Sequence, residues 1–300
     1  MRILITHDGS ECSSAALADL PNAGFPGTAT VLTFGVAEPP VGDPQVEAYL
    51  MNRRMTELRG SVTRAADRVR SMFPGWRVDT EVWPGVAGAA IAERAASFHP
   101  ELIVVGSHDR GRFGRLLLGS VSQSVLHHAN CSVRVARRPL QRYEEGLRLL
   151  IGLDGSHDAD AVVRAVAARY WPVSAEVRVV GVVDAGVPLA VAEPALSAVG
   201  DGATLSSISA YYEEHSDPLE AMAESLKTAA AALRAAGVRA APQVLEGDPA
   251  ETLLYEAEQW GADCIFVGAR GLGRLERLLL GSVSSTVATG ARCSVEVVRT

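Results

Sequence analysis

The chain contains the same long stretch of sequence twice. Residues 101–136 read ELIVVGSHDRGRFGRLLLGSVSQSVLHHANCSVRVA, and residues 263–298 read DCIFVGARGLGRLERLLLGSVSSTVATGARCSVEVV, at a constant offset of 162. The beginnings match too, because ILITHDGS (3–10) and LIGLDGS (150–156) each end an apolar run in Asp-Gly-Ser, here at an offset of 146. A repeat of this length is a whole domain rather than a solenoid unit. We therefore expect two domains, at residues 1–138 and 147–300, with 16 extra residues (162 − 146) in the second.

Composition limits the class of protein. The 300 residues are 48% apolar and 21% charged, which suits two globular domains that each bury a core. A net charge of −7 argues against a nucleic-acid partner. The chain has no apolar run of about 18 residues, no leader pattern and no CxxC pair among its four cysteines. We expect a cytoplasmic protein with no membrane partner.

Apolar runs alternate with helical patterns in both copies. This order predicts an α/β fold in which each copy forms a parallel sheet covered by helices on both faces. The expected strands lie at residues 3–6, 30–36, 76–82, 102–105 and 132–135, and at 148–153, 176–183, 238–245, 264–267 and 294–298. Residues 184–216 are rich in Ala, Gly, Pro and Ser and hold the extra length, either as a lid or as a plain surface insertion.

The second copy carries a glycine-spaced loop after its fourth strand. Gly268 directly follows a buried run, Gly271 comes three residues later, and Gly281-Ser282 opens the next helix. Glycines allow exposed N–H groups in a loop, and a helix start presents free N–H groups with a partial positive charge. Asp154 ends the first strand, which should neighbour the fourth, and can accept ribose hydrogen bonds or help hold Mg²⁺. Together these features predict a triphosphate site.

These residues resemble the universal stress protein family. Gly268-x2-Gly271-x9-Gly281-Ser282 is similar to that family's ATP-binding signature, and the resemblance covers nearly the whole chain as a tandem two-domain member. It implies doubly wound five-stranded sheets of order 3-2-1-4-5, with the last strands of the two domains paired as an internal pseudo-dimer. It also implies an ATP-binding protein that acts in stress response by nucleotide-dependent regulation. The residues it assigns to ATP are Leu153, Asp154, Val182, Val267, Gly268, Gly271, Gly281, Ser282, Val283 and Ser284.

The first copy departs from this signature at one position. Asp109 stands where the second copy has Gly271, and a carboxylate beside a triphosphate costs about 1 kcal/mol at 4 Å in water and several times more in a cleft. We therefore expect ATP mainly in the second domain, and a degenerate site in the first. The matching first-copy positions are Thr6, His7, Asp8, Val36, Gly106, Gly119, Ser120, Val121 and Ser122.

The first copy also brings together side chains that bind metals. His7-Asp8 ends its first strand and His108-Asp109 follows its fourth, and the implied strand order makes these strands neighbours. Two imidazoles and two carboxylates are a ligand set for Zn²⁺ or Mn²⁺. The alternative is that these are solvated loop residues pointing in different directions.

Two other functions stay open at this point. One is a slow ATPase, although no general base stands out near Arg270, Arg274 and Arg277. The other is a nucleotide-free interaction scaffold whose glycines only preserve the fold. The downstream protein partner is not indicated, and a homodimer beyond the internal pair is a further option.

Overall fold

The computed structural model describes residues 1–40, 44–107, 118–137, 146–155, 159–183, 218–269 and 280–299. The predicted segment 184–216 and the loops holding His108, Asp109 and Gly271 lie outside these ranges.

Each half of the chain alternates strands with helices. The strands of the first half are β1 (Arg2–Thr6), β2 (Thr30–Ala37), β3 (Arg77–Pro84), β4 (Leu102–Gly106) and β5 (Ser132–Ala136). Its helices are α1 (Glu11–Asp19), the short 3-10 helix η1 (Leu20–Ala23), α2 (Pro44–Met72), α3 (Ala87–Phe98) and α4 (Ser120–His128). The strands of the second half are β6 (Arg148–Leu153), β7 (Glu176–Val183), β8 (Arg239–Glu246), β9 (Cys264–Gly268) and β10 (Ser294–Val298). Its helices are α5 (Ala159–Ala167), α8 (Pro218–Ala235), α9 (Pro249–Trp260) and α10 (Ser282–Gly290).

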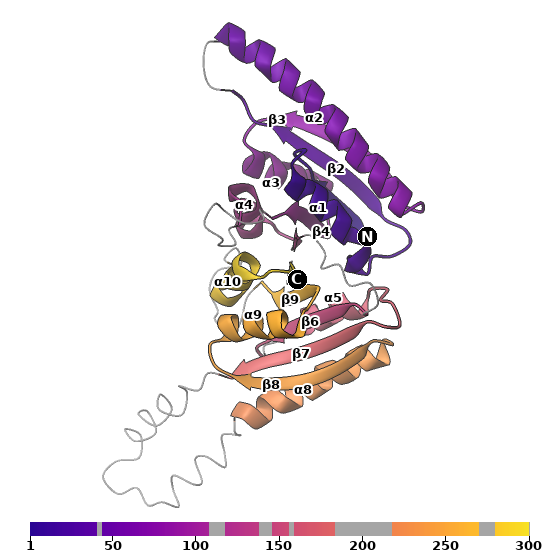
Figure 1. Cartoon of the computed structure of the whole chain (residues 1–300), viewed down its shortest axis with the longest axis vertical. Coiled ribbons are helices and arrows are strands. Elements are labelled where there is room, and N and C mark those ends of the chain that lie inside the picture. The colour runs from indigo at the N-terminus through magenta and orange to yellow at the C-terminus, as the bar shows by residue number, and fades with distance from the viewer. Residues whose placement is uncertain are drawn as a thin grey trace, which may run out of the picture.

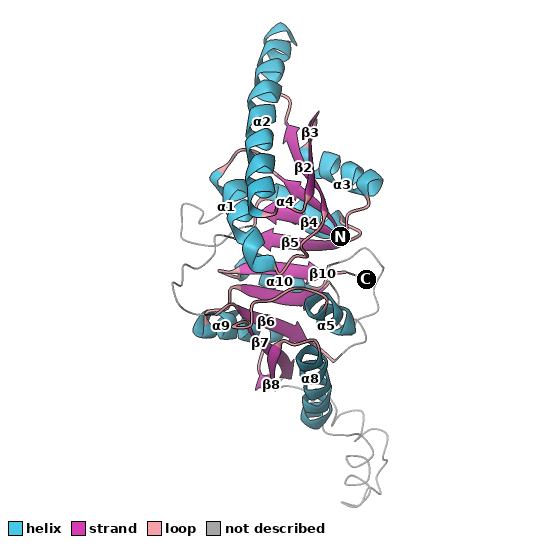
Figure 2. Cartoon of the chain, turned by 90° about the vertical axis from the view of Figure 1, so that its right-hand side faces the viewer, coloured by secondary structure: helices cyan, strands magenta, loops and turns pink. Residues whose placement is uncertain are grey.

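The strands join into one ten-stranded sheet of order β3-β2-β1-β4-β5-β10-β9-β6-β7-β8. Within each half every pairing is parallel, and the order is 3-2-1-4-5 counted in that half. The halves meet where β5 pairs antiparallel with β10, in the middle of the stack of strands in Figure 2. The predicted fold, strand order and pairing of the last strands are confirmed.

Helices cover both faces of the sheet, and one core crosses the junction. Figure 1 shows α2 at one end of the molecule and α8 at the other. The apolar faces of α1 and α2 pack on β1 to β4, and those of α5 and α8 pack on the second half. The core under α3, α4, α9 and α10 is shared, because it contains the inward residues of β5 and β10 alike (Val133, Val135, Val295, Val297). None of the described helices is long and apolar enough to cross a membrane.

A loop of the second half makes a further contact with the first. Between α5 and β7, the Tyr170 N–H donates to the Gly24 carbonyl at 2.9 Å, and the Arg169 guanidinium donates to the Ala23 carbonyl at 2.9 Å. The Trp171 ring lies over Gly24, where an added Cβ would stand 2.7 Å from it. Gly24 has φ +63°, so both its backbone and its neighbour in the other domain favour glycine.

This contact predicts that Gly24→Ala destabilises the chain more than backbone strain alone would. Gly237→Ala is the matched control, because Gly237 also has positive φ (+84°) but nothing lies within 4 Å of its added Cβ. We expect Gly24→Ala to lower the free energy of unfolding by about 1–3 kcal/mol more than Gly237→Ala. Urea denaturation measures both, and equal losses would mean that Trp171 moves aside freely.

Candidate functional site

The candidate site of the first domain lies where β1, β2 and β4 end and α1, α3 and α4 begin. The structure has there a cavity of about 330 Å³, which is within the size range of small-molecule sites. All nine residues that the sequence indicated for the first domain line it: Thr6, His7, Asp8, Val36, Gly106, Gly119, Ser120, Val121 and Ser122. No sequence pattern indicates Phe34 and Glu38 at the β2 end or Ala87 and Ile91 of α3, which also line the cavity. The tertiary fold brings these four residues to it.

The repeated Asp-Gly-Ser is a turn that holds one carboxylate in place. Gly9 has φ +82° and Gly155 has φ +75°, conformations that favour glycine. In the first domain the Ser10 N–H donates to Asp8 Oδ1 at 2.9 Å, and Ser10 Oγ accepts from the Ser13 N–H as the cap of α1. Partial burial raises the pKa of Asp8, but the hydrogen bonds from Ser10 and Ser13 outweigh it and hold that pKa below its ordinary value. Asp8 therefore presents a negative charge at the cavity edge at neutral pH.

A serine fixes each helix start to the strand before it. Ser122 Oγ donates to the Gly106 carbonyl at 2.6 Å, and Ser284 Oγ donates to the Gly268 carbonyl at 2.5 Å. The sequence assigned Ser122 and Ser284 to nucleotide binding, and in the structure each hydroxyl donates its proton to the carbonyl of a strand-ending glycine. These serine hydrogen bonds hold the first turns of α4 and α10 in position. The N–H groups of a first helical turn have no partners within the helix.

Gly106 has a packing reason as well as a predicted ligand role. A Cβ at this position would stand 2.7 Å from the backbone oxygen of Cys12 and 3.0 Å from the backbone nitrogen of Ser13. Those atoms belong to the first turn of α1, so a side chain at 106 would push the helix start away from β4. The glycine that ends β4 therefore lets α1 close one side of the cavity.

His7 points away from solvent and toward α2. Its side chain is 6% exposed, and its Nε2 lies 3.1 Å from Ser61 Oγ, whereas its Nδ1 has no hydrogen-bond partner among the described residues. Burial lowers the pKa of His7, and Arg64 adds to this, whereas the Asp8 carboxylate and the Ser13 backbone raise it. The balance favours the neutral imidazole.

The metal site predicted at His7, Asp8, His108 and Asp109 stays a prediction. His108 and Asp109 lie outside the described residues, and among the residues that the structure does describe no three His, Cys, Asp or Glu side chains gather around a point that could hold an ion.

The second domain repeats the described parts of this arrangement. Leu153 ends β6 and Asp154 follows it, Val182 lies near the end of β7, and Val267 and Gly268 end β9. Gly281 is the N-cap of α10 with φ −64° and ψ 151°, nearly the same as its counterpart Gly119 with φ −63° and ψ 154°. The remaining predicted residues, Ser282, Val283 and Ser284, form the first turn of α10. Gly271 lies outside the described residues.

Comparison with known proteins gives one consistent result. The model of the Universal stress protein family matches residues 1–137 and again residues 147–299. A universal stress protein of Mycolicibacterium smegmatis is 35% identical over 227 residues, which are 75% of this chain and 70% of that protein. One of Mycobacterium tuberculosis is 30% identical over 227 residues, 74% of this chain and 68% of that protein.

Solved structures show the same fold. The crystal structure of a universal stress protein from Archaeoglobus fulgidus is similar with a TM-score of 0.64 and 20% sequence identity, over 99% of this chain and 98% of that one. A putative universal stress protein from Pseudomonas aeruginosa is similar with a TM-score of 0.54 and 14% identity, over 99% and 92%.

The buried imidazole predicts that stability depends on pH. Since the pKa of His7 in the folded chain is below the ordinary value of 6.5, the unfolded chain binds a proton first as the pH falls below about 6.5. The contribution of His7 to stability is therefore present above that pH and is lost between it and the lower folded pKa. We expect His7→Gln to reduce the loss of unfolding free energy between pH 7 and pH 5.5, measured by urea denaturation.

The control for this variant is His128→Gln, which makes the same exchange at an exposed histidine at the end of α4. If His7→Gln lost as much unfolding free energy between the two pH values as this control, proton uptake at His7 would not be linked to unfolding.

Proposed function

The chain belongs to the universal stress protein family, and we propose that it is an ATP-binding member that acts in stress response through nucleotide-dependent regulation. ATP is held mainly in the second domain, at the edge of the sheet where β6 and β9 end. The observation that carries this proposal is the cavity of about 330 Å³ in the first domain, because the repeat places the same strand ends and the same helix start at the second site.

The phosphates fit the start of α10. Its N-cap Gly281 has an extended backbone and no side chain, so a ligand can approach the N–H groups of the first turn closely. The hydrogen bond from Ser284 to the Gly268 carbonyl holds this turn against the end of β9, so the N–H groups are oriented before a ligand arrives. The helix dipole adds a partial positive charge at the same place.

The nucleoside and the metal ion fit the opposite side of the site. Asp154 follows β6, and the glycine after it has a positive φ (+75°) close to that of Gly9 after Asp8 (+82°). A carboxylate there can accept hydrogen bonds from ribose hydroxyls or help hold the Mg²⁺ that accompanies ATP. The apolar end of β7, with Val182, offers a surface for the base.

The first domain keeps the helix start and the carboxylate but carries Asp109 in its loop. Its cavity is also lined by Asp8 and Glu38, and these negative charges make an anionic ligand less favourable there. This supports weaker nucleotide binding in the first domain.

Ser282→Pro tests the phosphate contact directly. Proline is favourable at the first position of a helix, and Gly281 already has the extended backbone that a residue before proline needs. The variant removes one N–H group from the first turn without breaking α10. We expect ATP affinity to fall about tenfold or more, measured by calorimetry, because a hydrogen bond to a charged group is worth about 1.5–3 kcal/mol.

Two control variants separate the possible causes. Ser282→Ala removes the hydroxyl but keeps the N–H, and we expect its affinity to stay close to that of the wild type. Ser120→Pro makes the matching change at the start of α4, where Gly119 has the same backbone, and should affect only the weaker site. Unchanged ATP affinity in Ser282→Pro, with an unchanged melting temperature, would contradict the proposal.

Mass analysis of the small molecules released from denatured protein identifies the ligand. Adenine nucleotide in an amount near one per chain supports an ATP-binding role. Its absence, together with no calorimetric response to added ATP and Mg²⁺, would favour a nucleotide-free scaffold.

A further inference from the structure

The junction between the two halves has two opposite charges at its centre. In the pairing of β5 with β10, Arg134 lies directly opposite Glu296, and both side chains are almost fully buried, at 0% and 1% exposure. These two residues occupy the same position in the two copies of the repeat, since 134 + 162 = 296. The pseudo-twofold axis that relates the copies therefore passes between them.

The contacts on either side of this centre are symmetric. Arg137 and Arg299 are also equivalent positions (137 + 162 = 299), and each extends into the other half. The Arg137 guanidinium donates to the Ala288 carbonyl near the end of α10 at 2.6 Å, and that of Arg299 donates to the Leu126 carbonyl near the end of α4 at 2.7 Å. Because the same contact forms in both directions, it suits any pairing of two such domains.

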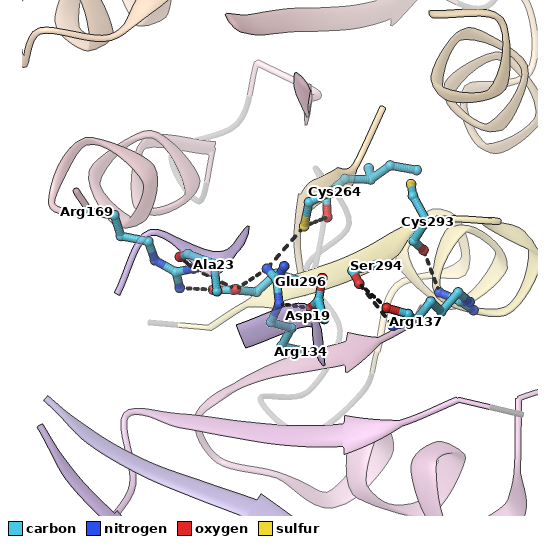
Figure 3. Close-up of polar contacts among 10 residues, drawn as sticks. Asp19, Ala23, Arg134, Arg137, Arg169, Cys264, Cys293, Ser294 and Glu296 are labelled. Atoms are coloured by element: carbon cyan, nitrogen blue, oxygen red, sulfur yellow. Dashed lines mark hydrogen bonds and ion pairs between the residues drawn. The ribbon is translucent and has the colours of Figure 1, made fainter. Parts of the chain in front are cut away.

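The centre, by contrast, is a chain of alternating charges. Arg134 donates to Asp19 of α1 at 2.7 Å and to Glu296 at 3.3 Å, and Glu296 also pairs with Arg169, whose Nη1 lies 2.9 Å from Glu296 Oε2. Figure 3 shows the four side chains in the order Asp19, Arg134, Glu296, Arg169. The side chains of all four are at most 7% exposed.

The two outer residues of this charge chain, Asp19 and Arg169, each occur in one copy of the repeat only. At the offset of 146 that relates the early parts of the copies, Asp19 corresponds to Ala165 and Arg169 corresponds to Ala23. The first domain thus contributes the pair Asp19 and Arg134, and the second domain contributes the different pair Glu296 and Arg169.

We propose that the charge chain of Asp19, Arg134, Glu296 and Arg169 selects the partner of the last-strand surface, so that a first domain pairs with a second domain and not with another first domain. Pairing of two first domains would place one Arg134 opposite another, and pairing of two second domains would place Glu296 opposite Glu296. Residues directly opposite in an antiparallel pair have Cα atoms about 5.5 Å apart or closer, and buried like charges at this distance repel strongly.

The symmetric arginines and the apolar core do not distinguish these arrangements, whereas the charges at the centre do. A complementary pairing is still available between two chains, because a first domain also fits the second domain of another copy. Within one chain the tether gives the two domains a high effective concentration, which favours the closed single-chain form.

Two charge-reversed chains test this selection. Glu296→Arg leaves the first domain intact but places two arginines at the centre, and Arg134→Glu leaves the second domain intact but places two glutamates there. In a mixture, the intact first domain of one chain fits the intact second domain of the other. When the two variants are refolded together, we expect native mass spectrometry to show about tenfold more one-to-one heterodimer than two differently mass-labelled wild-type chains give.

The outcome that overturns the proposal is a heterodimer fraction no greater than that of the wild-type mixture, with each variant refolding alone as the wild type does. That would mean that the charges do not influence partner choice.

A neutral chain keeps the proposal testable if charge reversal prevents folding. The quadruple variant Asp19→Asn, Arg134→Met, Glu296→Gln and Arg169→Met removes all four charges together, a change that buried ion pairs often tolerate. We expect it to fold and, after refolding at high concentration, to form more dimers and larger assemblies than the wild type, because like domains can then pair. A distribution of masses identical to that of the wild type would overturn the proposal.

Discussion

The antiparallel pairing of β5 with β10 determines the rest of this molecule. Each half would otherwise have an open edge at its last strand, with unpaired backbone groups exposed to other chains. Joining the edges makes one ten-stranded sheet and places Val133, Val135, Val295 and Val297 in a single core under helices from both halves. The sequence thus repeats the domain pattern twice, but the two halves share the core that α4 and α10 cover.

The same pairing fixes where the two candidate sites lie. All strands of one half run parallel to its last strand, and the last strands run in opposite directions. The carboxyl ends of the two sets of strands therefore lie at opposite edges of the sheet, each with its own helix start. The two candidate sites therefore cannot share one ligand.

Much of the fold could be predicted because local sequence patterns indicate the strands. The expected strands at 148–153, 176–183 and 294–298 have the bounds found in the structure, since each is an apolar run between turn residues or charges. The repeat shows the same order of strand and helix patterns twice, and the family resemblance implies the strand order. The expected strand ends therefore lie within two residues of those in the structure, and nine predicted positions gather around one cavity.

What the sequence could not predict depends on contacts between distant residues. Arg134 in SVRVA and Glu296 in SVEVV alternate with valines, a pattern typical of a strand with one face toward solvent. Asp19 of α1 and Arg169 after α5 cover that face, so the charges are buried instead. Likewise, the position of His7 against Ser61 joins residues 54 apart in the sequence, and no local pattern indicates it.

Comparison of the two copies distinguishes residues that the fold requires from residues that a ligand would require, whereas the sequence signature contains both kinds. Gly106 makes room for the backbone of Cys12, and the hydroxyls of Ser122 and Ser284 hold a helix start to a strand. These contacts form whether or not a ligand binds, so the serine in both copies and the glycine that ends β4 have a packing role of their own. The first copy has Asp109 where the second has Gly271, at a position between the strand-ending glycine and the serine. The serine contact and the helix start are nevertheless alike in the described parts of both domains. A duplicated domain can therefore change this loop without losing the serine contact or the helix start, and a difference in ligand preference between the two domains would arise at the loop and not at the strand end.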